Sequence, residues 1–92
     1  MNIGSYFDVF PELEEKCREM LRGQYIKLMG TDPLPEMEDY MITIGIKTEQ
    51  SRTEFFENFK ILFTDKTEEL VKFMFEKLAP CITKTYKQLL RQ

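Results

Sequence analysis

The chain has 92 residues, of which 42% are hydrophobic and 32% charged, with a formal net charge of −3. This composition predicts a single globular domain over residues 1–92 and excludes intrinsic disorder. The absence of histidine excludes a Cys/His zinc site and any histidine-based catalytic triad.

The charge is unevenly distributed along the chain. Residues 1–39 contain nine acids and four bases, whereas residues 40–92 contain seven acids and nine bases. A surface that contacts phosphate is therefore expected in the second part. The alternative is that surface charge simply fluctuates along the chain.

Cys17 and Cys81 both fall on the apolar side of a predicted helix, so we expect buried free thiols in a reducing compartment. The N-terminus lacks the basic-then-apolar pattern of a signal peptide, and no apolar run approaches 18 residues. These features predict a soluble cytoplasmic protein that does not insert into a membrane.

A helix is expected in the first third of the chain, residues 1–30. Pro11 suits a first helical turn, and Gly30 suits a helix end. Between them, apolar residues recur at helical spacing, at Leu13, Cys17, Met20, Leu21, Tyr25 and Leu28. Residues 31–39 hold two prolines and four acids, and they are predicted to form an extended linker.

Residues 41–47 alternate in a way that predicts a strand. One face carries Ile42, Ile44 and Ile46, and the other carries Thr43, Gly45 and Lys47. A lone strand leaves backbone groups unpaired, and no second strand is obvious nearby. The simplest solution is pairing with the same strand of a second copy, and such a two-stranded ribbon fits the major groove of DNA.

Two helices are expected after the strand. Ser51 and Glu54 match a capping box, and the phenylalanine-rich pattern over residues 54–63 is helical. A second strand over residues 59–63 is the alternative, but it leaves Phe55 and Phe56 in a loop. After a turn at residues 64–67, a second apolar stripe runs to Leu78.

Pro80 is predicted to end or kink that second helix. A short C-terminal helix over residues 80–92 then carries Lys84, Lys87 and Arg91 on its polar side, with no acid among the last twelve residues. This basic side is either a solvated helix face or a surface that contacts phosphate.

Residues 40–79 resemble the ribbon-helix-helix family of dimeric DNA-binding proteins. The resemblance implies an α+β, mostly helical fold, in which one short strand pairs across a homodimer, with an extra helix at each end. It implies that Thr43, Gly45 and Lys47 face the base edges and that Lys66 and Thr67 contact a phosphate. It also implies a dimer core that contains Ile42, Ile44, Ile46, Phe59, Leu70 and Met74.

Two functions follow as hypotheses. The first is sequence-specific binding of duplex DNA by a dimeric regulator or a plasmid or phage accessory protein. The alternative is a small non-enzymatic adaptor or inhibitor that binds a protein partner through its acidic first helix or an exposed apolar helix face. An enzyme, a metal and a cofactor are not expected, because the sequence has no Gly-rich phosphate loop and no cluster of metal ligands.

Overall fold

Every regular element in the computed structural model, which describes residues 2–92, is helical. The α-helices are α1 (Tyr6–Val9), α2 (Glu12–Met29), α3 (Pro35–Tyr40), α4 (Arg52–Phe63), α5 (Thr67–Phe73) and α6 (Ala79–Leu90). Two π-helical segments, η1 (Met41–Ile46) and η3 (Met74–Leu78), and one 3₁₀ turn, η2 (Thr64–Lys66), complete the chain. The predicted α+β fold is therefore wrong, since residues 2–92 contain no strand.

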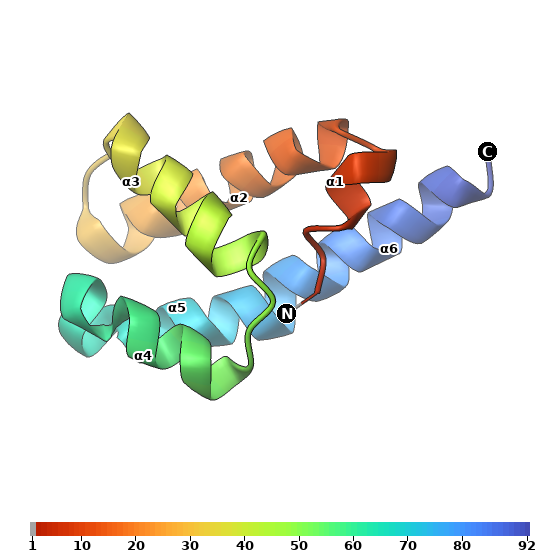
Figure 1. Ribbon diagram of the computed structural model, residues 1–92. Coiled ribbons are helices and arrows are strands. Elements are labelled where there is room, and N and C mark those ends of the chain that lie inside the picture. Colours follow the sequence, from red (N-terminus) through yellow and green to blue (C-terminus); the bar gives the residue numbers. More distant parts are fainter. Residues whose placement is uncertain (1) are drawn as a thin grey trace.

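The helices form two layers (Figure 1). One layer contains α2 and the helix formed by α3 and η1, and the other contains α4 and the helix that runs from α5 through η3 into α6. The short α1 packs against α2, and the C-terminal end of α6 projects beyond the rest of the molecule. The whole measures 41 × 25 × 19 Å.

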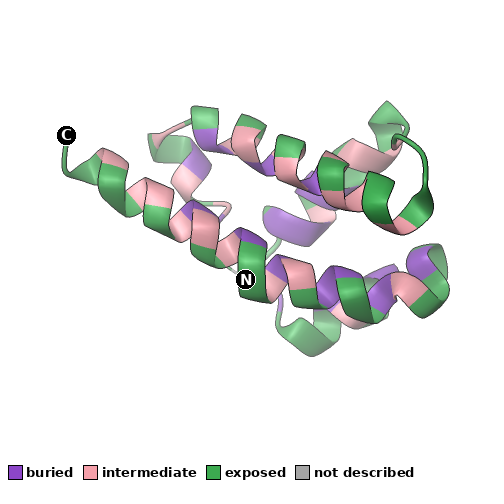
Figure 2. Ribbon diagram, turned by 180° about the vertical axis from the view of Figure 1, so that it is seen from behind, coloured by how far each residue is buried: buried purple, intermediate pink, exposed green. Residues whose placement is uncertain are grey.

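The core lies between these layers. Phe55, Phe59 and Phe63 form a buried stripe on α4, and they belong to the same buried cluster as a second stripe on the long helix. This second stripe consists of Leu70, Met74, Leu78 and Ile82, all fully buried. Buried residues accordingly follow the inner edge of each long helix, and exposed residues cover the outer edge (Figure 2).

The segment predicted to be a strand continues the α3 helix instead. Met41, Ile42, Gly45 and Ile46 are buried, and their spacing is that of one helix face. The Lys47 N–H donates to the Ile42 carbonyl at 2.9 Å, which is the i→i+5 bond of a π turn. The expected pairing of this segment across a homodimer therefore has no strand to carry it.

The backbone groups at the end of η1 find partners inside the chain. The buried Gln50 side chain donates to the Ile44 carbonyl, and Asn58 Nδ2 in turn donates to Gln50 Oε1 at 2.7 Å. Thr48 Oγ1 donates to the Thr43 carbonyl at 3.0 Å. These contacts satisfy carbonyls that a helix end leaves open, so a second copy is not needed to pair them.

The predicted linker over residues 31–39 is wrong in its second half. The helix α3 begins at Pro35, which occupies a first-turn position where its missing N–H costs nothing. The carboxylates of Glu38 and Asp39 then bind Arg22 and Arg18 of α2, each at 2.8 Å. Acids that suggested a solvated linker instead attach α3 to α2.

The helix predicted after Ser51 is confirmed as α4, and the alternative strand over residues 59–63 is wrong. Both hydrogen bonds of the Ser51–Glu54 capping box are present, at 3.1 and 3.2 Å. The turn predicted at residues 64–67 is also confirmed, as η2.

Of the two predicted effects of Pro80, ending or kinking the second helix, the structure excludes the first. The Ala79 N–H donates to the Met74 carbonyl, so η3 is wound more widely than an α-helix just before the proline. A proline ring in an α-helix clashes with the carbonyl of the preceding turn, and the wider turn relieves this clash. Residues 67–90 therefore run as one continuous helix.

Candidate interaction surface

The residues expected to read DNA bases lie in different environments. Thr43 is exposed, and Lys47 Nζ binds Glu14 Oε1 at 2.7 Å. Gly45 is buried, and a Cβ atom added to it would lie 3.2 Å from the Phe55 ring and 3.4 Å from the Phe59 ring. The side of Gly45 that was expected to face DNA therefore faces the core.

The residues expected to contact phosphate belong to the turn between α4 and α5. Thr67 is buried, and its hydroxyl donates to the Thr64 carbonyl at 2.7 Å. Lys66 is half-buried beside it. The Thr67 hydroxyl thus closes the turn.

The residues expected to form a dimer core pack within one chain. Ile42, Ile46, Phe59, Leu70 and Met74 are buried in the core, and Ile44 is half-buried against it. The apolar face that motivated subunit pairing is therefore already covered by the chain's own helices.

The structure does point to a different surface, because charge is segregated along the chain. Residues 1–76 contain sixteen acids and nine bases, a net charge of −7, whereas residues 77–92 contain four bases and no acid. Nearly all of this positive segment is α6. Separated charge of this kind creates a local potential that attracts an oppositely charged partner.

The arginines of α2 and the three outer cations near the C-terminus have different surroundings. Arg18 and Arg22 are bound to carboxylates of α3. Within residues 2–92, by contrast, Lys84, Lys87 and Arg91 are exposed and have no ion-pair or hydrogen-bond partner. These three cations remain available to a ligand.

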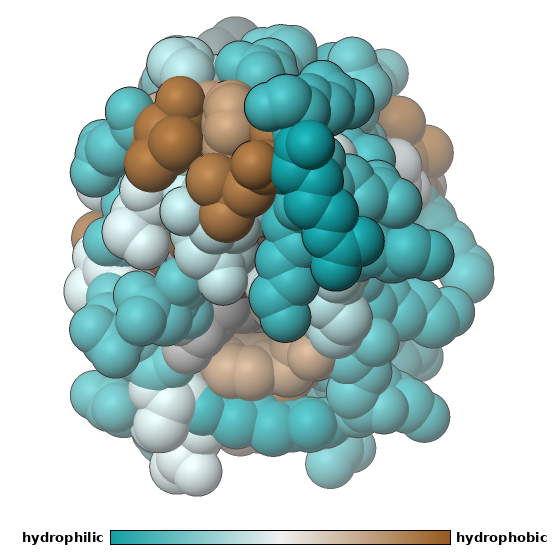
Figure 3. Space-filling model, turned by 90° about the vertical axis from the view of Figure 1, so that its right-hand side faces the viewer, coloured by the Kyte–Doolittle hydropathy of each residue, from teal (hydrophilic) through white to brown (hydrophobic). Residues whose placement is uncertain are grey.

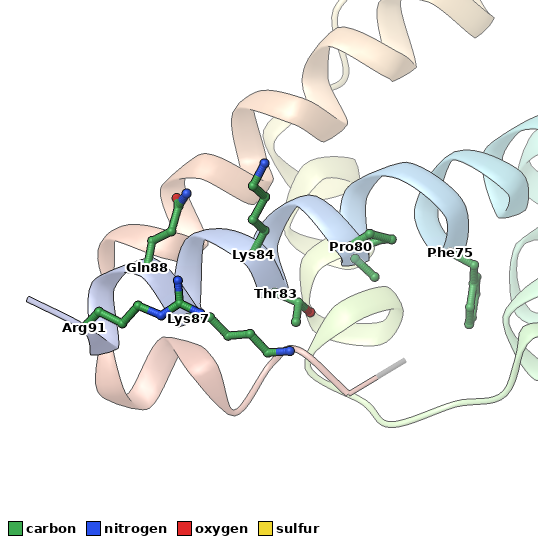
Figure 4. Close-up of a pocket in the computed structure, with 8 residues that line it drawn as sticks. Phe75, Pro80, Thr83, Lys84, Lys87, Gln88 and Arg91 are labelled. Carbon is green, nitrogen blue, oxygen red and sulfur yellow. The ribbon is translucent and has the colours of Figure 1, made fainter.

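An open groove of about 650 Å³ lies along the same face. Its apolar lining comes from Phe75, Ala79 and Pro80, and Lys84, Lys87 and Arg91 line its other end. Phe75 and Lys87 extend to one side of the helix and Lys84 to the other (Figure 4). Because a single helix supplies the whole lining, the groove is shallow and suits a polypeptide segment better than a small molecule.

The N-terminal residues hold the inner face of α6. The rings of Tyr6 and Tyr86 stack with centroids 4.0 Å apart, and Phe10 contacts Tyr86 edge-on at 5.7 Å. Seen from the end where α6 projects, the surface is mostly hydrophilic, with a brown apolar patch at the upper left and a paler apolar area below the centre (Figure 3). The exposed large hydrophobic residues of α1 and α6 are Val9 and Leu90, respectively.

Both thiols are free, as expected, but only Cys17 is buried, and Cys81 is half-buried. Burial raises the pKa of Cys17 to about 12, and the neighbouring Cys81 thiol acts in the same direction. A thiol with so high a pKa is protonated at neutral pH and is a poor nucleophile.

The carboxyl groups whose pKa departs from the ordinary value are all shifted downward. A hydrogen bond from Lys47 lowers the pKa of Glu14, one from Arg52 lowers that of Glu76, and the capping box lowers that of Glu54. Over residues 2–92 no three acid or thiol side chains gather to hold a metal ion. None of the helices described is both long and apolar enough to cross a bilayer.

Sequence reasoning identified the basic side of α6 but missed the groove beside it. Phe75 was expected only as part of the apolar stripe that runs to Leu78, and Pro80 was expected to end or kink the helix. The lack of acids after Glu76 was the signal that marked this region. Comparison with protein-family models, curated proteins and solved structures finds no match for this chain.

Proposed function

We propose that this protein is a small non-enzymatic interaction module that binds an acidic segment of a partner protein along the outer face of α6. The observation that carries this proposal is the row of three unpaired cations beside an apolar groove floor. An amphipathic helix with acidic and apolar residues has the complementary chemistry: its apolar side covers Phe75 and Ala79, and its carboxylates meet the cations.

The surroundings of the titratable groups support a non-enzymatic role. Active sites commonly contain a carboxyl whose pKa is raised or a thiol whose pKa is lowered. In this chain the shifts of Glu14, Glu54, Glu76 and Cys17 all run the other way. Each of these shifts follows from burial or from a contact within the fold.

Duplex DNA is the competing ligand for the same three cations. In the DNA-binding hypothesis a paired ribbon reads the major groove, but the segment expected to form this ribbon, Met41–Ile46, is helical. The three cations of the α6 groove form a short row, and residues 1–76 carry a net charge of −7, which repels a polyanion. These observations favour the protein partner.

The test is a titration of the ¹⁵N-labelled chain with a 16-residue amphipathic peptide of glutamate and leucine at helical spacing, followed by NMR. We expect chemical-shift changes concentrated in residues 75–91. The triple variant K84E/K87E/R91E should lose this binding because it reverses the rim charge.

The control variant K27E/K60E/K72E has the same net charge as the triple variant and should bind like the wild type, because its substitutions lie on exposed positions outside the groove lining. A parallel titration uses a 20-base-pair duplex at two salt concentrations. Salt-sensitive binding of the duplex without binding of the peptide would overturn the proposal.

A further inference from the structure

The outer faces of the two longest helical runs carry complementary charges at the same spacing. On α2, Glu12, Glu15 and Glu19 lie at positions i, i+3 and i+7. On α6, Lys84, Lys87 and Arg91 have the same spacing. With a rise of 1.5 Å per residue, each row covers roughly 10 Å of helix.

The acidic row of α2 points away from the core. Glu12, Glu15 and Glu19 are exposed, and the buried residues Leu13, Cys17 and Leu21 lie on the opposite side of the same helix. In the described part of the chain none of the three glutamates has an ion-pair or hydrogen-bond partner. The row is therefore as available to a ligand as the basic row of α6.

Beyond the glutamates, the same face of α2 carries a glycine, which has no side chain, and then an apolar residue. Gly23 is exposed, with no atom within 4 Å of an added Cβ, and Ile26 is 42% exposed. When α2 is laid antiparallel on α6 with Glu19 beside Lys84, Glu12 lies beside Arg91, whereas Glu15 lies beside Gln88, one residue out of register with Lys87. In this register Gly23 meets Pro80, where a side chain would collide with the ring.

One turn further along this register, Ile26 approaches the groove floor of Phe75 and Ala79. Three features of α2 thus face complementary features of the other helix. The glutamates face the basic row, Gly23 faces Pro80, and Ile26 faces the apolar groove floor. Because charge, space and apolar contact all match in one register, the outer face of α2 is a better occupant of the groove than an arbitrary acidic helix.

We infer that the α6 groove binds the outer face of α2 from a second copy of this chain. The inference rests on the proposed function, since it names the partner of the same groove. The contact joins two different surfaces, so each bound pair retains one free α2 face and one free α6 groove. Such a heterologous contact produces rings or chains of copies rather than a closed two-fold dimer.

Sedimentation of the full chain over a range of concentrations tests the inference, at about 25 mM and about 500 mM salt, because screening weakens exposed ion pairs. We expect the average mass to rise above 11.0 kDa with concentration at low salt and to return to that of a monomer at high salt. The variants E12K/E15K/E19K and K84E/K87E/R91E should each weaken self-association by about tenfold or more. An equimolar mixture of the two variants should associate again, because the reversed, basic α2 row of one variant meets the reversed, acidic α6 row of the other.

Three further variants separate this contact from general charge effects. D32K/E49K/E69K and K27E/K60E/K72E match the net charges of the two triple variants at other exposed positions, and they should associate like the wild type. Gly23→Phe changes no charge and lies in open space, so it should leave the fold intact yet weaken association.

Failure of this inference is distinguishable from failure of the proposed function. A wild-type chain that stays monomeric at low salt but binds the acidic peptide overturns the second-copy contact alone. Self-association that ignores both reversed rows also overturns it. A chain that neither associates nor binds the peptide overturns both.

Discussion

The π turns η1 and η3 both widen a helix by one residue, yet different residues account for them. In η1 the Lys47 N–H reaches the Ile42 carbonyl, and in η3 the Ala79 N–H reaches the Met74 carbonyl. Gly45 of η1 faces two phenylalanine rings of α4, whereas η3 comes directly before Pro80. The first is explained by packing and the second by a proline in the helix.

The two turns also differ in what surrounds them. Four of the six residues of η1 are buried, and its end is closed by the buried Gln50 side chain. In η3, Glu76 and Lys77 are exposed, and Phe75 lines the open groove. A π turn inside the core is fixed by its neighbours. Only the outer side of η3 is available to contribute to a binding face, because Met74 and Leu78 on its inner side are buried in the core.

Gly45→Val should break the packing of η1, and we expect the largest stability effect from it. The added Cβ would already lie 3.2 Å from the Phe55 ring, and the valine methyls would overlap the Phe59 ring. Overpacking of a core typically costs about 1–3 kcal/mol. Urea denaturation followed by circular dichroism measures this loss in the free energy of unfolding.

Gly23→Val is the matched control, since it makes the same change on an exposed helical glycine with no neighbour within 4 Å. It should raise the free energy of unfolding by a few tenths of a kcal/mol, because valine is a better helix former than glycine. If Gly45→Val gained as much stability as Gly23→Val, the rings would have moved aside, and Gly45 would not determine the packing.

Pro80→Ala tests the other half of the comparison, because it removes the proline to which we attribute η3. The variant regains a backbone N–H and loses the ring, so we expect the free energy of unfolding to rise by about 1 kcal/mol. This is less than the roughly 3 kcal/mol by which alanine exceeds proline in a helix interior, because the wide turn already relieves part of the clash.

Pro35→Ala is the control for this substitution, since Pro35 lies in the first turn of α3, where proline costs nothing. It should bring no gain in stability. A loss of stability in Pro80→Ala would instead show that packing around Phe75 and Leu78 requires the wide turn.

The parts of the fold that were predictable from the sequence are those with local signals. Ser51 and Glu54 fix the start of α4, and Gly30, with a left-handed backbone at φ 78°, ends α2. The apolar stripes between such signals follow helical spacing, and each of them became a helix. Caps and periodicity act over a few residues, so a single sequence reveals them.

The strand prediction failed because its pattern has two interpretations. Ile42, Ile44 and Ile46 alternate as in a strand, but Ile42 and Ile46 are also four residues apart, as on one face of a helix. Met37 and Met41 continue the helical spacing backwards into the predicted linker, and this signal was overlooked. Contact with the rings of α4 decides between the patterns, and that contact is not local.

The candidate site was half predictable. Lys84, Lys87 and Arg91 share one face in any helical reading of the C-terminus. The groove floor needs Phe75 and Ala79 in the same helix as these bases, and therefore a helix that passes Pro80. The preceding π turn makes this possible, and no rule applied to the sequence alone predicted that turn.

The smallest effect concerns the ion pair at the end of η1, which is less exposed than the Arg52–Glu76 pair that joins η3 to α4. Lys47 binds Glu14 of α2 at 2.7 Å, and this hydrogen bond holds the pKa of Glu14 below its usual value of 4.5. A carboxyl whose pKa is lowered by folding stabilises the fold above its unfolded pKa. That stabilisation is lost as the pH falls through the folded pKa.

Lys47→Gln should therefore lower the free energy of unfolding by less than about 1 kcal/mol near pH 7, since the pair is partly solvated. The difference from the wild type should shrink as the pH falls below 4.5. Lys60→Gln is the control, because Lys60 pairs with Glu57 between exposed side chains of one helix and joins no two elements. Urea denaturation at several pH values measures both variants, and a Lys47→Gln deficit that persists unchanged at pH 3 would contradict the role of Glu14 ionisation in holding η1 to α2.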